Sequence, residues 1–315
     1  MKKTLLALAV LAASGAAFAQ SATLSGSYVF GYQSTKVAGV TTAGFGTDTA
    51  AIALTATEDL GGGLKATAKV SLGNMMRDGA GTGEDAFLSL SGGFGTVSMG
   101  TVETDDGLAR ARAGVPGIGL DGKVHAGNPP IDYISFTSSQ LAPGLTAGVS
   151  YVDRGTAGTS GLAAGTTGVA AAQPSITANV SYKAGPIDAR FDVTSWTRQG
   201  AADVTSNTTK NRFRVSGNYN FGVASLGLGY SSLKRTTGTT AKETVIGLWA
   251  PVGAAEVGMQ YESMTDKGVK TTGTDFGAKY NLSKRTFVHA GYVQWKTEGA
   301  ATTNNSFRVL VGHSF

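Results

Sequence analysis

Apolar and polar residues alternate in sixteen short stretches between residues 21 and 315. In the last stretch, Phe307 and Val309 share one parity, whereas Ser306 and Arg308 share the other. Successive side chains of a β-strand point to opposite faces, so residues two apart lie on the same face. The pattern therefore predicts strands with one apolar face and one polar face.

The segments that join these stretches are predicted to alternate between tight turns and longer connections. The tight turns are rich in Gly, Pro, Asn and Ser, and fall near residues 61–63, 92–95, 142–144, 184–186, 220–222, 251–253 and 283–285. The longer connections fall near residues 34–48, 73–82, 103–130, 154–173, 198–210, 234–241, 265–272 and 298–303. An even number of strands with both chain ends beside the tight turns is typical of outer-membrane barrels. The predicted fold is all-β, a transmembrane 16-stranded antiparallel β-barrel.

The first residues of the chain have the pattern of a secretory signal peptide. Two lysines at positions 2 and 3 precede an apolar run, and Ala17-Phe18-Ala19 matches an A-x-A cleavage site. We expect a signal peptide over residues 1–19 and a mature barrel over residues 20–315. The mature chain keeps 24 of the 26 basic side chains against 21 acidic ones. This excess is too small to indicate nucleic-acid binding.

The residues of the mature chain offer little for catalysis. There is no cysteine, which excludes disulfides, thiol catalysis and cysteine-held metals. His125, His289 and His313 are far apart in the sequence, so local spacing predicts neither a metal site nor a Ser-His-Asp arrangement. We therefore expect no cofactor, no metal and no enzymatic activity. An esterase carried on a barrel and using His289 stays open as an alternative.

Strands rather than helices are expected to cross the membrane. After the signal peptide no segment has the roughly 18 to 20 apolar residues of a membrane helix. Strands of ten residues, at about 3.4 Å per residue and a tilt of about 45°, match the lipid band of about 25 Å. A soluble β-sandwich or small barrel is the alternative. The polar or charged parity found on nearly every strand favours a membrane barrel with a wet interior.

Several stretches resemble the general porins of Gram-negative bacteria, most closely those of the β-proteobacterial type. They are residues 20–26, 86–90, 93–100, 280–286 and 311–315, and the resemblance covers essentially the whole mature chain. It implies an outer-membrane homotrimer that lies in lipid and lipopolysaccharide and passes small hydrophilic solutes and ions. It also implies that the barrel-assembly machinery recognises Phe315. One departure is Thr101, where family members usually carry an arginine, which lowers the positive charge expected on the pore wall.

A 16-stranded barrel is wide enough to hold a water-filled lumen, so a further element must narrow it. Residues 103–130 form the longest connection, and the resemblance implies that this third loop folds into the barrel. The alternative is a mobile surface loop. The expected constriction residues are Glu103, Asp105, Asp106, Arg110, Arg112, Asp121 and Lys123, with His125 in the same segment. Residues 154–173 are nearly uncharged and suit an external loop.

The charges expected on the lumen wall predict a weak preference for anions. The basic wall residues are Lys69, Arg190, Arg212, Arg214, Lys279 and Arg308, with Lys65 and Lys183 nearer the tight turns. Together with the third loop, eleven bases oppose nine acids on the inward parity. We expect passive diffusion with weak anion selectivity. The alternatives are a substrate-selective channel of the same fold and a structural or adhesive barrel with a closed lumen.

Overall fold

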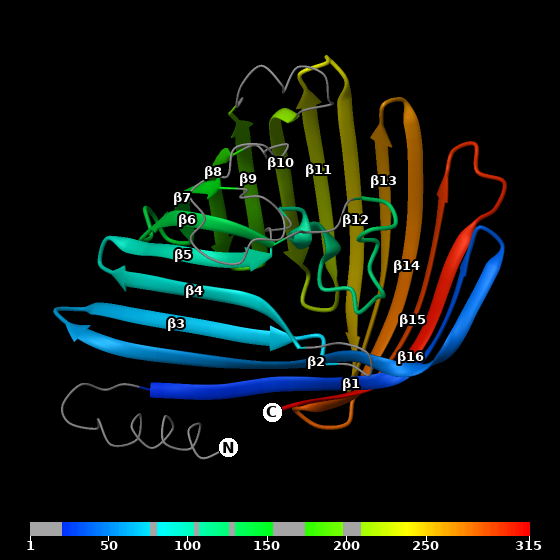
Figure 1. Ribbon diagram of the computed structural model, residues 1–315, viewed down its shortest axis with the longest axis horizontal. Coiled ribbons are helices and arrows are strands. Elements are labelled where there is room, and N and C mark those ends of the chain that lie inside the picture. The colour runs from blue at the N-terminus through cyan, green and yellow to red at the C-terminus, as the bar shows by residue number, and fades with distance from the viewer. Residues whose placement is uncertain (1–20, 76–80, 104–106, 126–129, 154–173, 198–208) are drawn as a thin grey trace.

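The computed structural model is a closed barrel of sixteen antiparallel strands (Figure 1). Each strand pairs with its neighbours in sequence, and the first strand pairs with the last. The strands are β1 (Ser21–Val37), β2 (Val40–Gly61), β3 (Leu64–Gly73), β4 (Thr82–Gly92), β5 (Gly95–Glu103), β6 (Pro130–Ser138), β7 (Leu145–Asp153), β8 (Ser175–Ala184), β9 (Ile187–Trp196), β10 (Thr209–Asn220), β11 (Ser225–Arg235), β12 (Thr240–Val252), β13 (Ala255–Asp266), β14 (Val269–Asn281), β15 (Thr286–Thr297) and β16 (Asn304–Ser314). Closure leaves no edge strand, so every strand pairs with a neighbour on each side, as lipid requires.

The structure describes residues 21–75, 81–103, 107–125, 130–153, 174–197 and 209–315. The predicted signal peptide, Asp105, Asp106 and residues 154–173 therefore lie outside the described residues. Among the described residues, no helix is long and apolar enough to cross a membrane.

The two faces of the sheet differ as the alternation predicts. Large apolar side chains are exposed on the outer face, including Leu54, Val70, Leu88, Ile134, Phe191, Val215 and Val311. The opposite parity carries the polar and charged side chains, which form ion pairs inside the barrel. An exposed apolar band around a polar interior is the reverse of a soluble barrel and matches a barrel surrounded by lipid. The prediction of the fold class is confirmed.

All seven predicted tight turns lie between strands, but several of the connections predicted to be long are short in the structure. Only Ala38 and Gly39 join β1 to β2, where residues 34–48 were expected to form a loop. Both have positive φ, as a two-residue hairpin turn requires. Residues 234–241 and 265–272 likewise reduce to short turns because the strands extend into them, whereas residues 298–303 form the whole connection between β15 and β16, as predicted. Strand ends outside the lipid need no apolar face, so the alternation fades there although the pairing continues.

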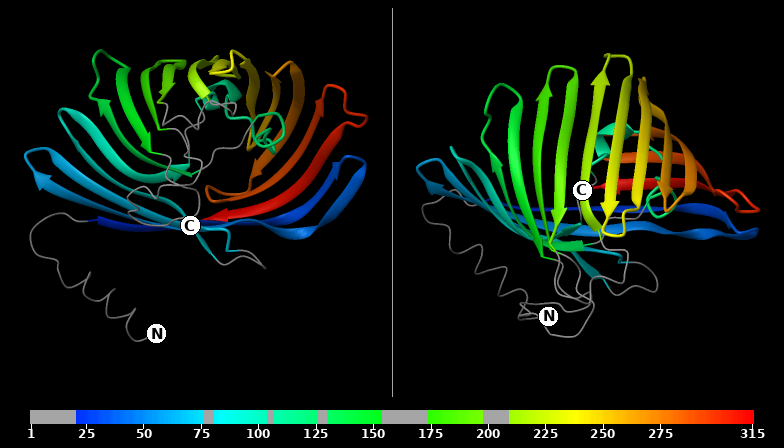
Figure 2. Two further views of the ribbon diagram at one scale, coloured as in Figure 1. Left: turned by 45° about the horizontal axis from the view of Figure 1, so that its top comes forward. Right: turned by 90° about the horizontal axis from the view of Figure 1, so that it is seen from above.

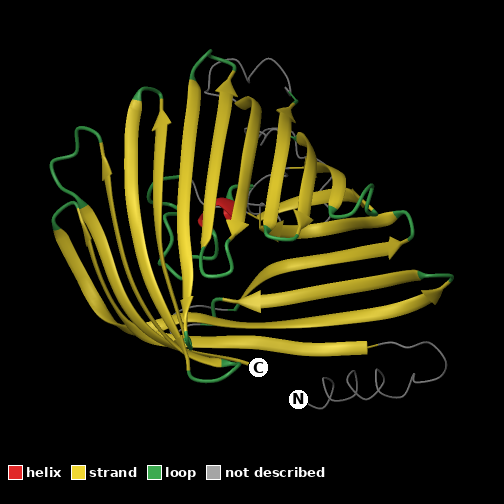
Figure 3. Cartoon of the chain, turned by 180° about the vertical axis from the view of Figure 1, so that it is seen from behind, coloured by secondary structure: helices red, strands yellow, loops and turns green. Residues whose placement is uncertain are grey.

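One segment leaves the wall and lies inside the barrel. Residues 107–125, hereafter the docked segment, follow β5 and include the 3-10 helix η1 (Ala109–Arg112). Figure 2 shows this segment within the curve of the strands, and Figure 3 shows η1 behind the same wall from the other side. Its contacts lie along β9 to β16. The docked segment therefore occupies the half of the interior beside β9 to β16, and the other half lacks these contacts.

Candidate pore constriction

A row of glycines on the inner wall makes room for the docked segment. These residues, hereafter the glycine track, are Gly227, Gly229, Gly247, Gly258, Gly273, Gly277 and Gly291, on β11 to β15. A Cβ atom at six of them would collide with an atom of the docked segment, and a Cβ atom at Gly258 would lie 3.0 Å from the side chain of Val115. Because none of them carries a side chain, the backbone of the segment can approach the sheet closely.

Apolar side chains hold both ends of the docked segment against the wall. At the η1 end, Leu108 and Ala111 pack on Val245 of β12, and all three are buried. At the other end, Leu120 and Val124 form a second buried cluster with β15, described below. Burial of such side chains contributes about 1.5–3 kcal/mol each relative to exposure. Two small hydrophobic clusters thus attach the docked segment to the inner wall of the barrel.

The second cluster joins the docked segment to β15 and also holds a lysine. Leu120 and Val124 contact Val293 and are flanked by Trp295. The Nζ atom of Lys123 lies 5.9 Å from the centre of the Trp295 ring, within reach of a cation–π interaction. Burial lowers the pKa of Lys123 below its ordinary value, and the nearby carboxylates oppose part of this effect. Lys123 is thus a partly desolvated cation at the inner face.

Hydrogen bonds to the main chain fix the middle of the segment. Asp275 of β14 is buried and accepts hydrogen bonds from the N–H groups of Ile118 at 3.0 Å and Gly119 at 2.9 Å. His289 of β15 lies with Nε2 2.7 Å from the carbonyl oxygen of Pro116. Because a carbonyl oxygen only accepts, His289 donates from Nε2. The histidine considered for an esterase is thus used to hold the segment.

The wall of β9 and β10 gathers positive charge. Asp188 pairs with Arg110 at 2.6 Å and Lys183 at 3.5 Å, and Asp192 pairs with Arg214 at 2.9 Å and Arg190 at 3.5 Å. A fifth base, Arg212, lies over the ring of Trp196. We call Arg110, Lys183, Arg190, Arg212 and Arg214 the basic arc. Among the described residues of this wall, five bases thus lie with two carboxylates, so the arc is mainly basic.

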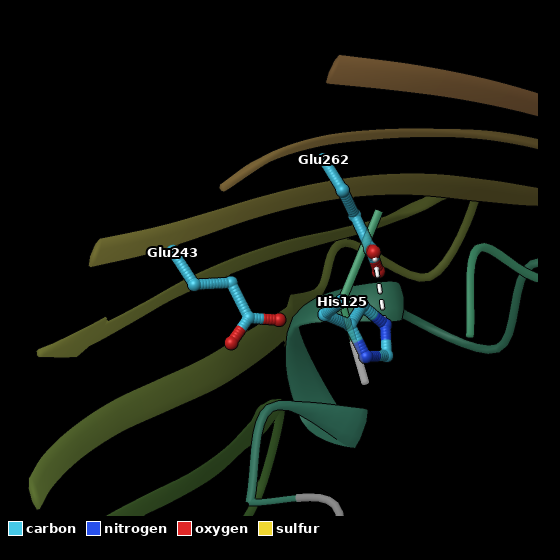
Figure 4. A group of neighbouring side chains, drawn as sticks. All are labelled: His125, Glu243 and Glu262. Atoms are coloured by element: carbon cyan, nitrogen blue, oxygen red, sulfur yellow. Dashed lines mark ion pairs between the residues drawn. The ribbon is translucent and has the colours of Figure 1, made fainter. Parts of the chain in front are cut away.

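The opposite end of the segment gathers carboxylates. Figure 4 shows His125 of the docked segment beside Glu243 of β12 and Glu262 of β13. Asp121 lies 3.0 Å from Nε2 of His125, and Arg112 donates from Nε to Oε1 of Glu262 at 3.1 Å. These five residues are hereafter the anionic cluster. The sequence predicted neither Glu243 nor the contact of Glu262 with the third loop, because spacing along the chain does not show which strands that loop contacts.

The remaining predicted site residues fall in separate places. Lys69 of β3 pairs with Asp85 of β4 at 3.1 Å, on the wall without contacts to the docked segment. Lys279 pairs with Glu256 at 2.9 Å. The guanidinium of Arg308 pairs with Asp48 at 3.0 Å and donates to the carbonyl oxygen of Gly117 at 3.1 Å.

Two residues of β5 lie differently from their expected positions. Glu103 is the last residue of the strand rather than part of the loop. Thr101 shares the parity of Met99, which is exposed on the apolar face, and hydrogen-bonds to Asp132 of β6. Thr101 therefore does not face the lumen. Contrary to our expectation, the residue at this position does not affect the charge of the pore wall.

A closed barrel with an apolar outer face and a charged interior is a water-filled channel of an outer membrane. The sequence model of the Gram-negative porin family matches residues 4–300, and the chain belongs to this family. Outer membrane porin protein 32 of Delftia acidovorans is 32% identical over 342 residues, which cover 96% of this chain and 92% of that protein. The chain is thus an outer-membrane porin that allows passive diffusion.

Solved structures agree with this fold. The anion-selective porin from Comamonas acidovorans superposes with a TM-score of 0.70 at 26% identity, covering 94% of this chain and all of that one. The trimer form of OmpT from Vibrio cholerae superposes with a TM-score of 0.68 at 14% identity, with the same coverage. At this low identity, the likeness to OmpT concerns the fold alone.

Proposed function

We propose that the docked segment is the constriction of this channel and that the basic arc gives it a weak preference for anions. The observation that carries the proposal is the one-sided attachment of the segment. Its contacts run from Asp188 on β9 to Arg308 on β16. Solutes then pass between the segment and the opposite wall, where Lys69 and Asp85 lie.

The sign of the selectivity follows from the distribution of charge. A mainly basic wall beside a narrow aqueous passage attracts anions and repels cations. The anionic cluster at the other end of the segment opposes this effect, so the net preference is small. It fades with salt, because the Debye length falls from about 10 Å at 0.1 M to about 3 Å at 1 M. The anion-selective porin from Comamonas acidovorans, a similar structure, supports the sign.

The assembly is proposed to be a homotrimer in outer-membrane lipid and lipopolysaccharide, formed after removal of residues 1–19. The trimer form of the Vibrio cholerae protein supports the oligomeric state. Phe315 is proposed to be the signal that the barrel-assembly machinery recognises. In the folded chain it exchanges two backbone hydrogen bonds of 3.0 Å with Gly26.

A test uses the absence of cysteine, because one introduced thiol becomes the only reactive one. Ala109 of η1 is exposed, on the part of the docked segment that the wall leaves uncovered. Coupling a bulky thiol reagent to the Ala109→Cys variant should lower single-channel conductance. The matched variant Ala301→Cys, exposed between β15 and β16, should keep its conductance after the same treatment. Equal responses of the two variants would remove the docked segment from the constriction.

Conductance also separates the proposal from its two alternatives. A substrate-selective channel would show block by one solute, and a closed structural barrel would show no conductance. An open, ohmic channel in planar bilayers is the expected result.

A further inference from the structure

We propose that Asp48 is a positioning residue of the constriction, which acts on the docked segment through Arg308. Asp48 belongs to β2 and Arg308 to β16, and β1 lies between these two strands (Figure 1). Among the described residues, the side chain of Asp48 is hydrogen-bonded to its neighbour Thr49 and to Arg308, and not to the docked segment itself. The inference rests on the proposed function, because it concerns the passage beside the docked segment.

A β-bulge in β2 turns Asp48 toward the lumen. Thr49 pairs with Val29 of β1, which is buried on the inner side. Thr47 pairs with Phe30, which is exposed on the outer side, so Asp48 is an extra residue in β2. In a regular strand, positions 47 and 49 would share one face and position 48 would lie on the other. The bulge breaks this alternation and re-aims the side chain of the extra residue, so the carboxylate of Asp48 lies inside the barrel.

Arg308 divides its guanidinium group between the wall and the docked segment. Its Nη1 atom donates to Oδ1 of Asp48 at 3.0 Å, and its Nη2 atom donates to the carbonyl oxygen of Gly117 at 3.1 Å. The other carboxylate oxygen of Asp48 accepts from Oγ1 of Thr49 at 3.2 Å, which orients the carboxylate. Because the guanidinium is a planar and rigid fork, fixing Nη1 also fixes the direction in which Nη2 points. Asp48 thus helps to set where the carbonyl group of Gly117 is held.

This contact lies at the edge of the attachment of the docked segment. The neighbouring contacts, at Pro116 and Ile118, come from β15 and β14. Arg308 adds a third strand, beside the seam where β16 meets β1. The side chains of Arg308 and Asp48 are 17% and 31% exposed, so both border the aqueous interior. A displaced Arg308 would therefore alter both the position of the segment and the charge beside the passage.

Two variants separate charge from geometry in planar bilayers. Asp48→Asn removes the charge that neutralises Arg308 and weakens the hold on its guanidinium, so the reversal potential should move toward anions and the open-channel noise should rise. Arg308→Lys keeps the charge but has no planar fork, so the noise should rise while the reversal potential stays near that of the wild type. The control Glu58→Gln removes one charge at an exposed position near the other end of β2, and should leave the noise unchanged.

Hydrogen exchange tests the position of the segment without any assumption about conduction. Exchange is followed by mass spectrometry on peptides from residues 107–125 of the purified, detergent-solubilised protein. The segment amides that Asp275 binds should exchange about two- to fivefold faster in Asp48→Asn, the range expected for a partly exposed ion pair. Arg308→Lys should show a similar increase, whereas Glu58→Gln should exchange as the wild type does. Wild-type exchange in Asp48→Asn would overturn the proposal.

An exchange of the two charges separates action through Gly117 from simple repair of the wall. The double variant Asp48→Arg with Arg308→Asp restores opposite charges on β2 and β16. However, a carboxylate at position 308 cannot donate to the carbonyl oxygen of Gly117. Exchange in the docked segment should therefore stay fast. Wild-type exchange in the double variant would show that the pair acts only by joining the two strands, and would overturn the positioning role.

The two measurements can fail separately. Faster exchange in Asp48→Asn without any change in noise or reversal potential would support the positioning role and refute the constriction proposed above. Altered conduction together with wild-type exchange would mean that Asp48 acts by its charge alone, and would overturn the positioning role.

Discussion

Gly277 of β14 leaves the space that the carbonyl group of Pro116 occupies, and a Cβ atom at position 277 would overlap that oxygen. The clash would involve backbone rather than a flexible side-chain end, so it could be relieved only by moving the docked segment or the strand. The position of the segment inside the barrel thus depends on the absence of side chains along the glycine track.

The first prediction follows from this contact. Gly277→Ala should push the docked segment away from the wall and cost about 1–3 kcal/mol of stability, as other cases of overpacking do. We expect an altered and noisier single-channel conductance. Gly44→Ala is the matched control, because a Cβ atom at Gly44 of β2 meets nothing within 4 Å. A Gly277 variant with wild-type conductance would show that the segment does not limit the flow.

The second prediction compares two loops. Deleting residues 107–122 removes most of the docked segment and should enlarge the channel or make it noisy. An equal deletion of residues 156–171, which lie outside the described residues, should leave conductance nearly unchanged. Single-channel recordings in planar bilayers decide the matter, and equal effects of the two deletions would contradict the assignment.

The sequence predicted the barrel well because a strand pattern is local. The parity of Val309 against Arg308 can be read from neighbouring residues, and the same holds for all seven tight turns. The ends of β1 and β2 could not be predicted, because polar strands outside the lipid have the same composition as loops.

The candidate site was predicted less fully, because its contacts join residues far apart in sequence. Arg110 and Arg112 were expected in the constriction, but not their partners Asp188 and Glu262. The sequence nevertheless contains one signal of this contact. Inward positions of β11 to β15 repeatedly carry glycine, such as Gly247, where a lumen wall would otherwise carry polar side chains. Such a row indicates the close approach of another backbone.

The third prediction concerns closure of the barrel. Removing Phe315 deletes both backbone hydrogen bonds to Gly26 and an aromatic ring that lies against that glycine. Outer-membrane yield should fall, and unboiled samples in SDS should show less of the compact oligomer. Phe315→Tyr keeps the hydrogen bonds and the ring, so it should restore most of the yield. Full yield of the truncated chain would exclude a role for the terminal residue in assembly.

The fourth prediction is a dependence on alkaline pH. Burial lowers the pKa of Lys123, so this side chain loses its charge at a lower pH than an ordinary lysine. In the folded protein the charged form is disfavoured. Holding the charged ammonium group in the folded protein therefore costs stability at neutral pH. This cost is lost as pH rises through the lowered pKa toward the ordinary value of 10.5. Stability should therefore rise slightly over this range, while anion preference should decline.

The measurement is the reversal potential in a KCl gradient at increasing pH. Wild type and Lys123→Gln should differ at neutral pH and converge as Lys123 is deprotonated. The control Lys267→Gln, at an exposed turn between β13 and β14, should leave the reversal potential at neutral pH close to that of the wild type. A Lys123 variant that never differs from the wild type would remove this lysine from the ion path.

The last prediction uses one ion pair on the wall that the docked segment leaves open. Nζ of Lys69 lies 3.1 Å from Oδ2 of Asp85, and both side chains are about one-third exposed, at 29% and 34%. Lys69→Gln should move the reversal potential toward cations, whereas Asp85→Asn should move it toward anions. Because the coupling of such exposed pairs is below about 1 kcal/mol, each permeability ratio should change by less than about fivefold. Both shifts should shrink at 1 M salt. Shifts of the same sign in the two variants would mean that they act by displacing the wall rather than through their charge.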